Sequence, residues 1–509
     1  MQNASAIDSL DAVLARHPFG NSDYIHQQLH ICYKRRLHKI SHRLPAAGRL
    51  LGELEQVGPY AQYRTLGDTV VRCAVQHAMR QIETGAPYGL PLEQCEEILR
   101  AAAGELAVRC GPLGSGLTHR LGPEPYHGWI WSEDRAAPAR DDVFVRSFLT
   151  LLHDNYGETQ LCTPDADELA MLSRGVRLLG ELLPRCARSA LTHAHVIAVF
   201  APAGEWATRA SSSQFRLSGT FFLSRGRLSS PWWLAEHMFH EALHQQIYDF
   251  RHGHSLLVPT YGERPGVQVC SPWNLPSPSR SNYWDTDRVL AAFHVYVHLA
   301  LLCTLAEQRA PELSGVYGPL DKMTGRRDAL ARAHYLAEQL RAACWDELGL
   351  AGRRFVDWFG SVLDALDPSP PPPGACVHLL LDRYRREARE VDTLQRSRAP
   401  SPERSRSLAA LAREEVRTAR RVLTAVDATA ARDRLEGVLA EFPEDDLADH
   451  FLKVRAVISR ALLDASPSGY GWAHDPRKPD EMVKQQIEHS SAALMALLAG
   501  DVNLSRPGA

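Results

Sequence analysis

The chain has 509 residues, a formal net charge of −3 and 45% hydrophobic residues. Its length suggests more than one domain, and its composition is ordinary for a globular protein. A net charge so close to zero creates no overall field that favours nucleic acid or an anionic membrane, so we expect neither as a partner.

The N-terminal sequence "MQNASAIDSLDAVLARHPFG" lacks the basic start and apolar run of a secretory signal. The ten cysteines are scattered, and no two of them form a CxxC pair. Both features favour a reduced, cytoplasmic protein in which cysteines serve as small apolar residues.

The first part of the chain predicts helices. Apolar residues recur there at three- and four-residue intervals, as in "LPLEQCEEILRAAAGELAVRC". Residues 111–140 carry many glycines and prolines and predict a long loop. We therefore expect a helical N-terminal region over residues 1–140.

The middle of the chain predicts a small sheet among helices. Helical patterns at 141–157 and 165–194 precede two strand candidates, 195–200 and 214–224. The apolar stretch 289–306 contains two histidines and predicts a buried core helix rather than a membrane span.

The sequence "DPSPPPPG", 367–374, predicts a stiff linker, and helical patterns resume after it. The expected fold is therefore mainly helical with a small central β-sheet. We expect a metal-binding catalytic region over 141–366 and a helical C-terminal region over 375–509.

One short motif carries the chemistry. "HMFHEALHQQ", 237–246, contains His240, Glu241 and His244 in the HExxH pattern. Residues four apart lie on one helix face, so both imidazoles can reach a shared cation, and Glu241 can reach a metal-bound water. The helix follows the strand-like "GTFFLS", as in zincin-like folds. A pair of packed helix histidines is the plain alternative, and His237 is expected to be an ordinary surface histidine.

A third protein ligand is needed for a metal site. The metzincin pattern fails, because Phe250 stands where its third histidine would be. The next long helix is apolar and presents His294 and His298, four residues apart. Either could be a ligand or a core residue.

Four stretches stand in a characteristic order between residues 60 and 305: "RTLGDTVVRCAVQHAM" (64–79), "ADELAMLSRGVRLLGELLPRCARSAL" (166–191), "SSSQFRLSGTFFLSRGRLSSPWWLAEHMFHEALHQQ" (211–246) and "SPWNLPSPSRSNYWDTDRVLAAFHVYVHLALL" (271–302). By their order and spacing the chain resembles the HExxH-type 2-oxoglutarate-dependent peptide β-hydroxylases of natural-product pathways. Only HExxH is specific by itself.

The resemblance implies a non-haem iron(II) hydroxylase that uses 2-oxoglutarate as co-substrate and oxidises an amino-acid or peptide C–H bond. It implies His240, His244 and His294 as iron ligands, with His298 as the fallback third ligand. Glu241 would orient water or a ligand histidine.

The co-substrate needs a cationic partner for its distal carboxylate, and Arg280 and Arg288 are the local candidates. The family commonly has Arg after Pro-Trp, where this chain has Asn274, which leaves the choice of arginine open. Tyr261, Trp273 and Tyr283, in the loop between the two histidine-bearing helices, are candidates to line the substrate pocket or to pack within the fold.

Two other functions stay open. A zinc metallopeptidase would use Glu241 as general base. In a catalytically inactive scaffold the histidines would only pack. The sequence indicates neither the substrate side chain nor the oligomeric state.

Overall fold

The fold is known from a computed structural model. The described residues form two compact units. Unit 1 contains Met1–Tyr261, Leu290–Ala329 and Asp346–Leu366, and unit 2 contains Gly262–Val289, Leu330–Trp345 and Asp367–Ala509. The structure describes residues 2–108, 112–124, 127–206, 209–274, 281–397, 401–442, 447–467, 469–472 and 475–499.

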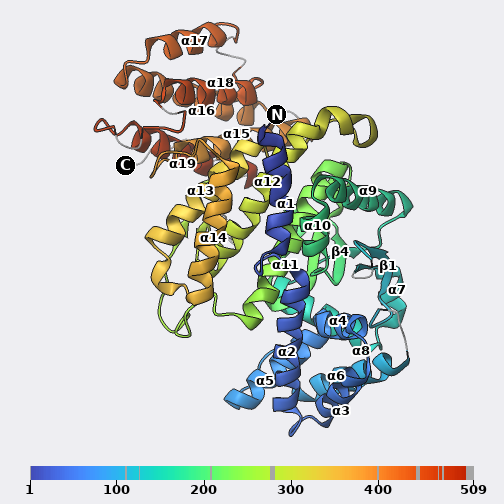
Figure 1. The fold of residues 1–509 in the computed structure, drawn as a ribbon. Coiled ribbons are helices and arrows are strands. Elements are labelled where there is room, and N and C mark those ends of the chain that lie inside the picture. The colour runs from blue at the N-terminus through green and yellow to red at the C-terminus, as the bar shows by residue number, and fades with distance from the viewer. Residues whose placement is uncertain are drawn as a thin grey trace. The chain divides into compact units, whose positions relative to one another are not determined.

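Unit 1 begins with helices, as the sequence predicts (Figure 1). Local signals start them: the Asn21 side chain accepts the backbone N–H of Tyr24, and the Asp68 side chain caps the fifth helix. The helices are α1 (Gln2–Arg16), α2 (Ser22–Ile40), α3 (Pro45–Gln56), α4 (Pro59–Gly67), α5 (Thr69–Thr84) and α6 (Leu92–Val108).

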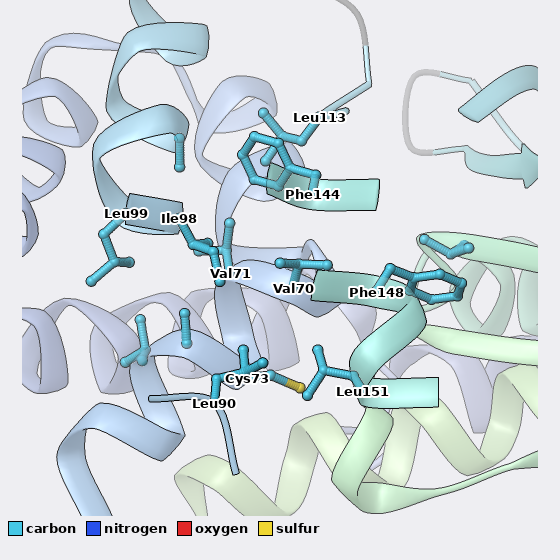
Figure 2. Packing of buried hydrophobic residues seen from close by; sticks show 14 of the residues in the cluster. Val70, Val71, Cys73, Leu90, Ile98, Leu99, Leu113, Phe144, Phe148 and Leu151 are labelled. Carbon is cyan, nitrogen blue, oxygen red and sulfur yellow. The ribbon is translucent and has the colours of Figure 1, made fainter. Parts of the chain in front are cut away.

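Apolar side chains from these helices form a large buried core. Figure 2 shows part of it, where Val71 of α5 lies beside Ile98 of α6 and Phe144 lies near Leu113. This core joins the N-terminal helices to the sheet of the same unit, since it also contains Val196 and Phe222.

The prediction of a loop over residues 111–140 is wrong for part of that segment. It contains strands β1 (Leu117–Leu121) and β2 (Gly128–Trp131) and the short helix α7 (Glu133–Ala136). The apolar sequence of β2 pairs in parallel with a strand far along the chain, which outweighs the local glycines and prolines. The helices before residue 140 lie in unit 1, which also contains the HExxH helix.

The sheet is small and mixed. Its strand order is β1-β2-β4-β6-β5, and β3 pairs with β4. The pairs β2–β4 and β4–β6 are parallel, and the other pairs are antiparallel. Strands β4 and β6 are fully buried, as expected for central parallel strands. The bounds are β3 (Leu161–Cys162), β4 (Val196–Phe200), β5 (Ser211–Ser213) and β6 (Thr220–Ser224).

The strand candidate 195–200 is confirmed as β4, but the candidate 214–224 is confirmed only in its second half. Its first half forms a tight 3-10 turn at Phe215–Leu217, followed by Gly219 with φ +91°. That conformation favours glycine, and it lets the chain reverse from β5 into β6.

The other helices of unit 1 include the predicted apolar helix, which is longer than expected. It is the one described helix long and apolar enough to cross a membrane, and its apolar window is entirely buried, as a core helix requires. Unit 1 contains α8 (Val143–Tyr156), α9 (Ala166–Leu182), α10 (Pro184–Leu191), α11 (Pro231–Gly253), α14 (Leu350–Leu366) and, from Leu290 on, α12 (Thr286–Tyr317).

Unit 2 is mainly helical. Helix α14 ends at Leu366, where the proline-rich segment begins. In the core of unit 2 the buried Arg455 side chain pairs with the carboxylates of Glu415 and Glu387. Its elements are β7 (Val269–Cys270), β8 (Tyr283–Trp284), most of α13 (Arg326–Ala342), α15 (Val377–Ser397), α16 (Pro402–Ala425), α17 (Thr429–Leu439), α18 (Phe451–Ala465) and α19 (Pro479–Ala499).

Candidate metal centre

Helix α11 carries the HExxH motif, and its start is set by local sequence. The Ser230 side chain accepts the backbone N–H of Trp233, and Pro231 occupies the first turn. The helix packs against α9 and α2, and most of its circumference is buried. His240 and His244 lie on its half-buried side.

The structure brings the two motif histidines together. Their Nε2 atoms lie 3.2 Å apart. Two nitrogens at this separation can both reach one ion at a bond length of about 2.1 Å. The same separation also suits an N–H···N hydrogen bond between the two rings. The pair can therefore supply two ligands of a metal site.

Glu241 points toward the edge of the sheet. Its side chain is buried, and its two oxygens accept hydrogen bonds of 2.6 and 2.5 Å from the hydroxyls of Ser211 and Ser213 on β5. The Ser211 hydroxyl also contacts Nδ1 of His237 at 3.0 Å. Strand β5 therefore fixes the direction of the Glu241 carboxylate.

The expectation that His237 is an ordinary surface histidine is wrong. Its ring stacks on Trp233 and contacts Ser211. Burial, followed by the nearby His240, lowers the pKa of His237 to about 3. The ring is therefore neutral at physiological pH and belongs to the same group of side chains as Glu241.

Helix α12 places His294 and His298 in the core of unit 1. His294 is fully buried, and neither of its ring nitrogens makes a well-aligned hydrogen bond, although the Leu243 carbonyl acts on the ring. Burial, then the charges of His298 and His244, hold the pKa of His294 well below its ordinary value. Nδ1 of His298 contacts the carbonyl of His294 at 2.8 Å. The choice between these two histidines as third ligand stays open.

Arg280 and Arg288 were predicted to anchor the co-substrate. Arg280 lies outside the described residues. Arg288 is exposed, and its guanidinium lies over the Trp284 ring, 4.7 Å from the ring centre. Both stay predictions. Of the three aromatic residues predicted to line the pocket, Trp273 is buried, Tyr261 is half-buried and Tyr283 is exposed.

The sequence analysis missed a buried charged cluster on the opposite side of α11. Asp249 lies nine residues after His240, which is about half a turn away around the axis. Its carboxylate pairs with Arg72 at 2.7 Å and contacts Nδ1 of His193 at 2.6 Å, and the His26 ring lies tilted against the His193 ring. The closely spaced His193 and His195 in "THAH" were the available signal.

This cluster is the one group of three described residues whose ligand atoms lie close enough to hold an ion. It consists of His26, His193 and Asp249, with ligand atoms within 4.8 Å of one another. The guanidinium of Arg72 already contacts both Asp249 oxygens, at 2.7 and 3.3 Å, which opposes a second cation. His240, His244 and His294 are not brought within that distance as a trio.

The cluster contains ionised side chains. Burial alone would raise the pKa of the Asp249 carboxyl, but the Arg72 guanidinium and the His193 hydrogen bond outweigh it and hold that pKa far below its ordinary value. Asp249 and Arg72 are therefore a permanently charged, fully buried pair. Comparison of the chain with protein-family models and with curated proteins gave no match.

Proposed function

We propose that the chain is a non-haem iron(II), 2-oxoglutarate-dependent hydroxylase whose metal is held by a zincin-like HExxH helix. The observation that carries the proposal is the pair of Nε2 atoms, 3.2 Å apart, on the half-buried side of α11. The substrate is an amino acid or a peptide with an oxidisable C–H bond.

The donor set suits iron(II) and leaves room for other ligands. His240 and His244 would hold the ion. His294, whose two buried ring nitrogens lack well-aligned hydrogen bonds, would become the third ligand only after a shift toward the pair, since the three histidines are not brought together as a trio. Imidazoles suit iron, and three protein ligands leave open positions. Bound iron(II) and 2-oxoglutarate would supply, with dioxygen as the oxidant, the hydroxylation of an unactivated C–H bond, with succinate and carbon dioxide as co-products.

The surroundings of Glu241 favour hydroxylation over peptide hydrolysis. A general base must direct a carboxylate oxygen at the water that it deprotonates. Both Glu241 oxygens accept hydroxyl hydrogens from Ser211 and Ser213, which directs the carboxylate at β5 rather than along the face of His240 and His244. In the proposed enzyme this carboxylate positions β5 against the metal-binding face of α11, and no proton transfer at Glu241 is required.

The alternative is a zinc metallopeptidase. It is favoured by the HExxH spacing itself and by the position of Glu241 one residue after the first ligand. In that enzyme the Glu241 carboxylate would have to turn from β5 toward a metal-bound water to accept its proton. The two functions therefore differ in what they require of one side chain.

The deciding experiment is anaerobic reconstitution with iron(II), followed by addition of oxygen and 2-oxoglutarate, with succinate as the product measured. We expect iron-dependent succinate formation, in uncoupled form without substrate. Absence of succinate under every metal condition, combined with zinc-dependent cleavage of a peptide library, would establish the peptidase instead.

A further inference from the structure

Strand β5 forms one edge of the sheet, and some of its backbone N–H and C=O groups point away from the neighbouring strand. It is the last strand in the order β1-β2-β4-β6-β5 and pairs antiparallel with β6. The backbone N–H of Ser224 donates to the carbonyl of Ala210 at 2.9 Å. Backbone pairing alternates along an antiparallel ladder, so the N–H and C=O groups of Ser211 and Ser213 point away from β6.

Among the described residues, no backbone group pairs with this outward side of Ser211 or Ser213. The three residues of β5 are half-buried, and so the strand is only partly covered. An edge of this kind offers alternating donors and acceptors to another extended chain.

Successive side chains around the circumference of α11 contact successive strands of the sheet. Gln245 faces β6, where its side chain bonds the backbone of Gly219 and Thr220. Glu241 faces β5. Successive residues are rotated by about 100° around the helix axis. Gln245 and Glu241, four residues apart, therefore point in directions about 40° apart.

Continuing in the same sense around the helix leads from Glu241 to the two motif histidines. Viewed down the helix axis, His244 lies about 60° beyond Glu241, and His240 lies about 100° beyond Glu241, both in the direction that leads from Gln245 to Glu241. The sequence of faces is therefore β6, β5 and then the histidine pair. The histidine pair lies under the position that a further strand beside β5 would occupy.

We propose that a peptide substrate binds as an added β-strand along the outward edge of Ser211–Ser213 and thereby crosses the face of His240 and His244. The inference rests on the proposed function and narrows its substrate to a peptide in extended conformation. Main-chain hydrogen bonds hold such a strand, and alternate side chains face the catalytic helix.

The same geometry identifies which peptide residue is oxidised. The hydroxyls of Ser211 and Ser213 point at α11, while the Ser212 hydroxyl points the other way, toward the Tyr156 hydroxyl. Directly paired residues on neighbouring strands share a face. The oxidised side chain therefore belongs to the residue paired with Ser211 or Ser213, and its two neighbours point away from the metal.

The test uses the full chain without metal and a displayed pool of random decapeptides as probe. Binders are then synthesised with backbone N-methyl groups at every second residue, in the two alternate phases. We expect one phase to weaken binding at least tenfold and the other to change it less than threefold, because only alternate amides face the edge. Hydrogen exchange should slow at the amides of Ser211 and Ser213.

A matched pair of variants checks the protein side. Ser213→Ala removes the hydroxyl but keeps the outward N–H, whereas Ser213→Pro removes both. We expect at least tenfold weaker peptide binding by Ser213→Pro than by Ser213→Ala. If Ser213→Pro does not fold, the N-methyl series on the unchanged chain still decides the matter.

The outcomes separate this inference from the proposed function. Equal loss of binding in both N-methyl phases, protection of amides elsewhere, or no binder at all would overturn the added strand. None of these binding measurements involves iron or 2-oxoglutarate. Strand-like binding without iron-dependent succinate would therefore retain the edge site and reject the hydroxylase, and the reverse result would reject only the edge site.

Discussion

Nδ1 of His193 lies 2.6 Å from a carboxylate oxygen of Asp249, and neither side chain is exposed. Arg72 bonds the same carboxylate. The contact joins α11 to the segment before β4 and to α5, on the side of α11 opposite His240. The orientation of the face of α11 that carries His240 and His244 therefore depends on a buried ion pair on the opposite side of the helix.

Removing the charge of Asp249 should destabilise the protein strongly. Asp249→Asn leaves the fully buried Arg72 without its counter-ion, and such a loss typically costs about 3–5 kcal/mol. Urea denaturation measures the change. The exposed Asp357 provides the control, because Asp357→Asn should alter the free energy of unfolding by less than about 0.5 kcal/mol. Equal effects of the two changes would contradict the buried ion pair.

Buried neutral histidines should make the fold sensitive to acid. Burial lowers the pKa of His77 to about 4, and its ordinary value is 6.5. The unfolded chain therefore binds more protons between these values, so the free energy of unfolding falls as the pH drops from about 6.5 to 4. His252, at about 3, acts in the same direction.

Replacing His77 should flatten that pH profile. His77→Gln loses the bond that Nδ1 accepts from the Leu90 N–H and lowers stability at neutral pH. Its profile between pH 6.5 and 4 should be shallower than that of the parent, by up to about 1.4 kcal/mol per pH unit. The exposed His153 gives the matched control, His153→Gln. A slope identical to the parent's would show that His77 does not contribute to it.

The ligand assignment predicts loss of iron from three variants. His240→Ala, His244→Ala and His294→Ala should each contain less than about a tenth of the parent's iron while keeping the helical circular dichroism signal. Metal analysis of proteins reconstituted with iron(II) measures this. His153→Ala should bind iron as the parent does. Normal iron content in His294→Ala would remove that residue from the ligand set and point to His298 or a carboxylate.

Glu241 separates hydroxylase from peptidase. We expect Glu241→Gln to keep its iron and to retain measurable uncoupled conversion of 2-oxoglutarate to succinate, because no proton transfer at this residue is required. A peptidase would lose about 10²- to 10⁴-fold in rate with the same change. Complete loss of succinate with full iron occupancy would contradict the role given to Glu241.

The co-substrate anchor is tested by two separate changes. Arg280→Ala or Arg288→Ala should weaken 2-oxoglutarate binding at least about tenfold while iron content stays the same, since an arginine–carboxylate bond is worth about 1.5–3 kcal/mol. Calorimetry on the iron-loaded protein without oxygen measures the affinity. If both variants bind 2-oxoglutarate like the parent, the anchor is another residue.

Helices were the most predictable part of this fold. The apolar periodicity of 289–306 identifies a core helix, although α12 extends beyond that stretch at both ends. Strand β2 was not predictable from its local sequence, because it pairs with β4 far along the chain, and β1 in turn pairs with β2. The turn at Phe215–Leu217 was read as strand since its apolar residues pack equally well from a turn.

Within the candidate site, the sequence spacing predicted only contacts between residues of the same helix. It places His240 beside His244, because four residues make about one turn. It could not predict that Ser211 and Ser213 hold Glu241, since that depends on where an edge strand crosses the helix. The Asp249–Arg72 pair was likewise beyond reach, because its partners are 177 residues apart.

Gly67, in the "RTLGD" stretch, touches the imidazole of His195. A Cβ atom at position 67 would stand 1.8 Å from Cε1 of that ring, far inside any permitted contact. A side chain at position 67 would therefore force the His195 ring out of its present position. In related chains the two positions should covary: where the glycine is replaced, a smaller residue should stand in place of the histidine.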